Sequence, residues 1–169
     1  MVNVCLGHPI KKFCFISSVS TLGRPSNLVQ NKEIRIDENQ KWEESELNSN
    51  YSKTKYLAEC EVWRASAEGL PVVILNPSII LGESSWQKSS TQIFKYVYDQ
   101  KLFYTAGTLN CVDVLDVATI AYELCKSDIV EERFVVSARS ITVKSLLDKI
   151  AAGFGVAAPK IQVKLFWLN

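Results

Sequence analysis

Two side chains of this sequence, a phenol and an ammonium, have a spacing that suits proton transfer. Tyr51 and Lys55 are four residues apart, so in a helix they lie on one face, where the positive charge would favour the phenolate. A phenol with such a neighbour can exchange a proton with a carbinol or carbonyl oxygen. Serines within residues 17–20 could hold the same oxygen by a hydrogen bond. Together these groups predict the proton relay of an oxidoreductase, which would work on a bound dinucleotide.

The segments around these residues predict the elements that would position them. Residues 12–18 form a short, β-rich apolar run, which is typical of a strand buried on both faces. A polar loop over 21–50 follows, and its last residues can cap a helix that begins near Tyr51 and ends near Gly69. Residues 70–75 then give a second buried strand. This βαβ order predicts an α/β fold with a Rossmann-like parallel sheet, in which the serines follow a strand end where ligands bind.

The rest of the sequence continues the alternation of strands and helices. The spacing of apolar residues predicts helices over 89–101, 117–126 and 142–154. Short apolar runs predict strands at 102–105, 112–115 and 133–137, and a short apolar end over 161–168. Asp116 is the predicted N-cap of the helix that follows it. We expect two domains, a sheet domain over 1–88 and part of a small α/β substrate-binding region over 89–169, with 111–137 returning to the sheet.

Composition narrows the class of protein. The chain has 169 residues, of which 47% are hydrophobic and 22% charged, as in an ordinary globular domain. Its net charge is +1 and it has no basic run, so we expect no nucleic-acid partner. The single histidine, His8, excludes a histidine triad and a histidine-rich metal site. Five scattered cysteines and the lack of a long apolar segment favour reduced thiols, no membrane partner and a cytoplasmic location.

A simpler interpretation of the Tyr51 and Lys55 pair must be kept beside the catalytic one. A capped helix with an exposed tyrosine and lysine, next to serines that merely end a strand, has the same sequence. Tyr122 and Lys126 have the same spacing but lack a serine-bearing strand at a suitable distance upstream. We interpret that second pair as a surface feature, and it provides a control for the first.

Four motifs occur in a characteristic order along most of the chain. They are Phe15 to Gly23, Tyr51-x-x-x-Lys55, Val72 to Gly82 and Val112 to Ala118. In this order they resemble the extended short-chain dehydrogenase/reductase superfamily. The branch they resemble is that of NAD(P)-dependent epimerase/dehydratase-like proteins, which includes dihydroflavonol reductases and hydroxysteroid dehydrogenases.

The resemblance assigns a role to each residue of the predicted relay. Ser18 would polarise the substrate oxygen, since it lies five residues before Gly23 as the family's serine lies before its glycine. Ser20 would be a nearby substrate contact. Tyr51 would be the general acid and base, and Lys55 would assist Tyr51 and hydrogen-bond the nicotinamide ribose.

The resemblance also implies a cofactor, NAD or NADP. Pro77, Ser78 and Ile79 match the family segment whose backbone faces the nicotinamide carboxamide, and Tyr51 and Lys55 would complete the cofactor contacts. The alternative for this segment is an ordinary turn at the end of a strand, which a proline favours in any case.

Several family features have no counterpart in the sequence. These are the glycine-rich phosphate loop, the residue that selects NAD or NADP, and the asparagine of the catalytic tetrad. Leu115 stands where related sequences often carry a basic residue, which argues against an anionic nucleotide-sugar substrate. We therefore expect a fragment of a reductase, the C-terminal half of a Rossmann-like domain. Alone it would expose a sheet edge and favour homo-oligomers.

Three functions remain open at this point. The first is part of an NAD(P)-dependent oxidoreductase that interconverts a small-molecule carbonyl and alcohol through the Ser18, Tyr51 and Lys55 relay. The second is a nucleotide-sugar epimerase or dehydratase, which shares the relay. The third is a non-catalytic remnant that acts as an interaction module. By itself, a fragment without the phosphate loop is expected to be inactive.

Overall fold

The computed structural model describes residues 1–23, 36–46, 48–87 and 89–163. Contacts divide the chain into two units. The first unit comprises residues 1–78 and 116–136, and the second comprises residues 79–115 with the part of 137–169 that the structure describes. Within the described ranges, no helix is both long enough and apolar enough to cross a membrane.

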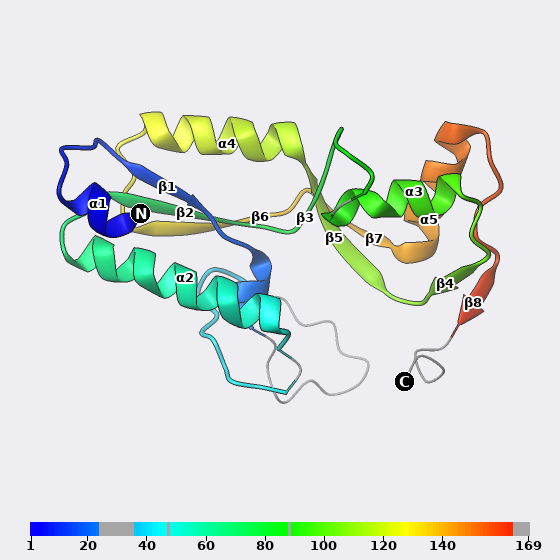
Figure 1. Ribbon diagram of the computed structural model, residues 1–169, viewed down its shortest axis with the longest axis horizontal. Coiled ribbons are helices and arrows are strands. Elements are labelled where there is room, and N and C mark those ends of the chain that lie inside the picture. The colour runs from blue at the N-terminus through cyan, green and yellow to red at the C-terminus, as the bar shows by residue number, and fades with distance from the viewer. Residues whose placement is uncertain (24–35, 47, 88, 164–169) are drawn as a thin grey trace. The chain divides into compact units, whose positions relative to one another are not determined.

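A parallel three-stranded sheet forms the centre of the first unit (Figure 1). Its strands are β1 (Phe13–Ile16), β2 (Val72–Pro77) and β6 (Glu132–Val136), in the order β1-β2-β6. All six residues of β2 are buried, as expected for the central strand of a sheet that is covered on both faces. The parallel sheet confirms the predicted α/β class, and strands β1, β2 and β6 lie close to the predicted runs.

Helices cover both faces of this sheet. Figure 1 shows α1 (Val2–Leu6) and α2 (Asn50–Ala67) on one face and α4 (Val114–Lys126) on the other. The apolar side of α2 packs on β2 through a buried cluster that includes Val62, Ala65, Val72 and Ile74. Burial of each large aliphatic side chain in such a cluster contributes about 1.5–3 kcal/mol. This packing fixes α2 against the strand ends that carry the predicted site.

Local signals set the ends of α2. The Ser49 hydroxyl accepts a hydrogen bond from the backbone N–H of Ser52 at 3.1 Å, which caps the first turn. Gly69 follows the last turn with φ +99, a backbone conformation that L side chains rarely adopt. Both signals lie where the sequence predicts the helix to begin and end.

The second unit contains a mixed sheet and a small parallel pair. Strands β3 (Ile79–Leu81), β5 (Thr108–Asp113) and β7 (Arg139–Thr142) form the sheet, with β3 parallel and β7 antiparallel to β5. Strand β4 (Phe103–Thr105) pairs with β8 (Ile161–Val163). Helices α3 (Gln92–Tyr98) and α5 (Val143–Phe154) share a buried cluster around Val97 and Leu147. The Thr142 hydroxyl caps α5 by accepting from the Ser145 N–H at 3.2 Å.

Three sequence expectations are wrong in detail. The predicted strand 112–115 is the end of β5 followed by the first turn of α4, which begins at Val114 and not after Asp116. Asp113 is the reason, because its carboxylate accepts from the Leu115 N–H at 2.7 Å. The predicted helix over 89–101 is a 3-10 turn, η2 (Ser89–Thr91), and the short α3. Strands β3 and β7 were not expected.

Parts of two predicted segments lie outside the described residues. In the loop over 21–50 these are residues 24–35 and 47, whereas residues 36–46 form neither helix nor strand. In the apolar end over 161–168, residues 161–163 form β8, and the remainder falls outside the described ranges.

Candidate active site at the carboxyl ends of the parallel strands

Ser18 lies just beyond the carboxyl end of β1 and caps a short 3-10 helix, η1 (Val19–Leu22). Its Oγ accepts hydrogen bonds from the backbone N–H of Ser20 at 3.2 Å and from the Ser20 Oγ at 3.0 Å. In the part of the chain that the structure describes, the Ser18 hydroxyl acts only as an acceptor. Its own proton is therefore available to a substrate oxygen, and Ser20 orients the hydroxyl.

Lys55 connects α2 to the end of β1. Its Nζ donates a hydrogen bond to the Ile16 carbonyl at 2.9 Å and lies 5.0 Å from the centre of the Phe15 ring. Ile16 is the last residue of β1, two positions before Ser18. An ammonium has three donors, so this contact leaves two for other acceptors. The structure thus brings the lysine to the strand end that leads into Ser18.

Tyr51 lies in the first turn of α2, one turn before Lys55, and 61% of its side chain surface is exposed. No hydrogen bond joins its hydroxyl to another group among the described residues. The tyrosine is therefore open to a ligand, but no direct contact joins its hydroxyl to that of Ser18.

The segment after β2 contains an unusual buried hydroxyl. Pro77 ends β2, the Ser78 N–H donates to the Val136 carbonyl at 2.9 Å, and Ile79 begins β3. Ser78 is only 7% exposed, and its Oγ has no hydrogen-bond partner among the described residues. An unsatisfied buried hydroxyl costs about 1–3 kcal/mol.

A buried carboxylate in the same region was not expected from the sequence. Glu59, one turn after Lys55 on α2, is 2% exposed and accepts a hydrogen bond from the Ser17 hydroxyl at 2.6 Å. It also pairs with Arg133 of β6, with 3.3 Å between Nη1 and Oε1. The spacing of Tyr51, Lys55 and Glu59 at every fourth residue was the available signal, since it places all three on one side of the helix.

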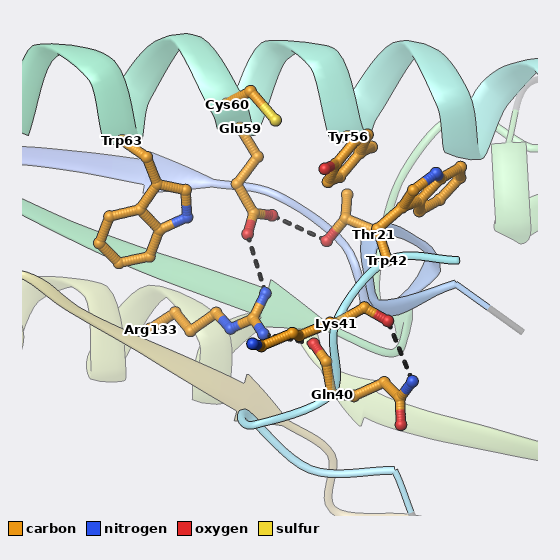
Figure 2. A pocket seen from close by; sticks show the side chains of 9 residues that line it. All are labelled: Thr21, Gln40, Lys41, Trp42, Tyr56, Glu59, Cys60, Trp63 and Arg133. Carbon is orange, nitrogen blue, oxygen red and sulfur yellow. Dashed lines mark hydrogen bonds and ion pairs between the residues drawn. The ribbon is translucent and has the colours of Figure 1, made fainter. Parts of the chain in front are cut away.

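A separate cavity of about 530 Å³ lies between α2 and the segment around residue 41 (Figure 2). Trp42 and Tyr56 stack at its wall, with ring centres 4.5 Å apart, and Glu59 and Arg133 also line it. The Cys60 thiol, as a hydrogen-bond partner, and desolvation raise the pKa of the Tyr56 phenol, which stays protonated at neutral pH. None of the predicted relay residues lines this cavity.

The control pair has a different setting. Lys126 Nζ lies 4.9 Å from the centre of the Tyr122 ring on α4, and Tyr122 is 60% exposed.

Among the residues that the structure describes, no group of three possible metal-ligating side chains is close enough to hold an ion.

Comparisons with known proteins define the class. The structure of a nucleoside-diphosphate-sugar epimerase from Pseudomonas aeruginosa matches 99% of this chain and 54% of its own, with a TM-score of 0.82 at 18% identity. A dTDP-glucose 4,6-dehydratase from Bacillus anthracis, solved in complex with NAD, matches 96% of this chain and 52% of its own, with a TM-score of 0.77 at 16% identity. At these identities the likeness establishes the fold, which is Rossmann-like.

Sequence comparison establishes the family. The family model described as male sterility protein, an NAD-binding family, matches residues 1–138. The chain therefore belongs to this NAD-binding male sterility family, within the extended short-chain dehydrogenase/reductase superfamily. This confirms the resemblance noted from the four motifs and the expected cofactor class, NAD or NADP.

Two curated relatives are similar to the chain over most of its length. A Synechocystis sp. protein, provisionally named dihydroflavonol 4-reductase, is 29% identical over 165 residues, which are 94% of this chain and 46% of the relative. Cinnamoyl-CoA reductase 2 of Arabidopsis thaliana is 30% identical over 126 residues, 70% of this chain and 37% of the relative. The chain thus spans less than half the length of these relatives.

Proposed function

We propose that this chain supplies the proton relay of an NAD(P)-dependent oxidoreductase that interconverts a small-molecule carbonyl and the corresponding alcohol. The observation that carries the proposal is the contact of Lys55 Nζ with the Ile16 carbonyl at 2.9 Å. It joins the helix of Tyr51 to the strand end that leads into Ser18. An isolated helix pair of tyrosine and lysine would not require that contact.

In the direction of reduction, each group has one task. A bound NADH or NADPH would supply the hydride to the carbonyl carbon. The Tyr51 hydroxyl would donate its proton to the carbonyl oxygen, and the Ser18 hydroxyl would donate a hydrogen bond to the same oxygen. The two remaining donors of Lys55 are available to the nicotinamide ribose and to the Tyr51 oxygen.

The position of Ser78 supports a cofactor contact through the backbone. It directly follows Pro77, the last residue of β2, at the carboxyl end of a parallel strand, where ligands of such sheets bind. With Pro77 and Ile79 on either side, we propose that this segment faces the nicotinamide end of NAD or NADP. Ser20 would touch the substrate beside Ser18.

A second candidate function is that of a nucleotide-sugar epimerase or dehydratase. The epimerase and the dehydratase of similar structure share the fold and would share the relay. The exposed Leu115 favours the reductase, because it is 72% exposed where related sequences often carry a basic residue. A diphosphate substrate normally binds basic side chains.

The test is a substrate panel with the full-length protein. NADH or NADPH would be supplied with a dihydroflavonol or a cinnamoyl-CoA thioester, and consumption of the reduced nicotinamide followed by absorbance. NAD+ or NADP+ would be supplied with a nucleotide sugar, and its product followed by chromatography. Consumption of reduced cofactor with a carbonyl substrate supports the reductase. Conversion of the nucleotide sugar without net cofactor consumption would instead support an epimerase or dehydratase, and no turnover with any substrate would favour an interaction module.

A further inference from the structure

The carboxylate of Glu59 is almost fully buried, although a lone carboxylate is costly to remove from water. It is 2% exposed, and among the described residues the hydrogen-bond and ion-pair partners of its carboxylate lie outside its own helix α2. A buried carboxylate is tolerated only where several hydrogen-bond donors surround it. The donors around Glu59 therefore show which parts of the chain it connects.

Three of the contacts involve one oxygen, Oε2. It accepts from the Ser17 Oγ at 2.6 Å and from the Asn76 Nδ2 at 2.9 Å, and it lies 2.7 Å from the Thr21 Oγ1. Ser17 directly precedes Ser18, and Thr21 is in the 3-10 turn that Ser18 caps. Asn76 lies near the carboxyl end of the neighbouring strand, β2. Glu59 thus connects the residues on both sides of Ser18, Ser17 and Thr21, to Asn76 of the neighbouring strand β2.

The Ser18 carbonyl is part of the same network. It accepts from the Asn76 Nδ2 at 3.1 Å and from the Thr21 N–H at 3.1 Å, and the Thr21 hydroxyl lies 2.8 Å away. The single proton of that hydroxyl can be donated either to this carbonyl or to Glu59. Whether the Thr21 hydroxyl donates to the Ser18 carbonyl or to Glu59, rotation of the Ser18 peptide would break the hydrogen bonds of that carbonyl. The carbonyl oxygen and its buried donor Asn76 would then lose a partner.

The other oxygen, Oε1, connects the network to a second segment. It meets Arg133 Nη1 at 3.3 Å, and Arg133 also donates to the backbone carbonyls of Glu38 at 2.8 Å and Gln40 at 2.6 Å. Figure 2 shows the Glu59 carboxylate between Arg133 and Thr21. The guanidinium offsets the buried charge, and each of its three nitrogens donates at least one hydrogen bond to the described residues.

We propose that Glu59 is a positioning residue, whose buried carboxylate fixes the Ser18 backbone so that the Ser18 hydroxyl meets the substrate oxygen. This inference rests on the proposed function of Ser18. A displacement of a catalytic group by about 1 Å can lower a rate a hundredfold, so loss of the network is expected to slow the chemical step. Cofactor affinity is expected to change little, because Glu59 is surrounded by protein groups.

The experiment is a double-mutant cycle in the full-length protein, with Ser18→Ala, Glu59→Gln and the combination. Each single change is expected to lower kcat about tenfold or more, with the Kd for the cofactor within about twofold. If Glu59 acts through Ser18, Glu59→Gln should have almost no further effect once Ser18 is alanine. Glu61→Gln is the control, since Glu61 lies on the same helix and is largely exposed.

The outcomes separate the two proposals. If Ser18→Ala lowers kcat and Glu59→Gln lowers it by the same factor in the Ser18→Ala background as in the unmodified protein, the two residues act independently. That result would overturn the positioning role of Glu59 while leaving the relay intact. No loss from Ser18→Ala would overturn the relay itself. Should Glu59→Gln fail to fold, Ser17→Ala replaces it in the cycle, because it removes a single donor to the carboxylate and the same coupling is expected.

Discussion

The ammonium of Lys55 donates a hydrogen bond to the Ile16 carbonyl at 2.9 Å, and this contact joins helix α2 to the end of strand β1. The two residues are 39 positions apart in the sequence. It connects the first two turns of α2, which the buried cluster holds against β2, to the strand end that leads into Ser18. The proposed relay requires this arrangement.

Replacement of Tyr51 by phenylalanine removes the proton that the proposed relay would transfer. We expect Tyr51→Phe to lower kcat of the full-length protein about a hundredfold or more, with cofactor binding largely kept. Steady-state kinetics and cofactor titration measure the two quantities. Tyr122→Phe, which alters the equally exposed tyrosine on α4, is the control and should have no effect. Equal losses from both changes would contradict the assignment.

Lys55 and Ser18 should have different kinetic signatures. We expect Lys55→Met to weaken cofactor binding about tenfold, because it removes the ammonium donors that we propose contact the nicotinamide ribose. Ser18→Ala should slow the chemical step with little change in cofactor affinity, since it removes one oriented hydrogen bond. If Lys55→Met leaves both the cofactor affinity and kcat unchanged, Tyr51 and Lys55 are an ordinary helix pair.

Cys14 of β1 should be an unreactive thiol in the folded protein. Burial, followed by its contact with Cys125, raises its pKa to about 11. The folded state therefore favours the neutral thiol. The resulting stabilisation is fully present below about pH 9, the usual value, and is lost as the pH rises toward about 11. Iodoacetamide labelling, read by mass spectrometry, should modify Cys14 at pH 8 far more slowly in the folded than in the unfolded chain. Similar rates would contradict the burial.

Gly82 should not tolerate a side chain. A Cβ at this position would lie 2.3 Å from Val114 Cγ1, so Gly82→Ala forces the neighbouring backbone or side chain to move. We expect it to lower the free energy of unfolding by about 1–3 kcal/mol, measured by denaturant titration. Gly153→Ala is the matched control, because a Cβ there meets nothing within 4 Å in helix α5. That change should stabilise the protein by up to about 1 kcal/mol.

Local chemistry was sufficient to predict several elements. The apolar runs predicted β1, β2 and β6, and the fully buried central strand β2 begins with an uninterrupted apolar run, Val72 to Leu75. The limits of α2 follow from Ser49 and Gly69, which act within one turn of the chain and need no distant partner. The four ordered motifs likewise pointed to the family without any knowledge of packing.

The start of α4 and the short strands β3 and β7 could not be predicted from local sequence patterns. Residues Val112 to Leu115 resemble a strand locally, yet α4 begins at Val114 because Asp113 caps it. The short β3 and β7 exist only because both pair with β5, and strands of three or four residues have little intrinsic signal.

The sequence by itself predicted a class of chemistry, because the types and spacing of Tyr51 and Lys55 are local properties of one helix. Only the tertiary structure decided that Lys55 reaches Ile16 and that Glu59 is buried. The donors that make this buried carboxylate acceptable come from residues 17, 21, 76 and 133, which are distant along the chain. Whether a glutamate on a helix faces water or the interior depends on the partners that folding brings to it. The local sequence around Glu59 does not identify those partners.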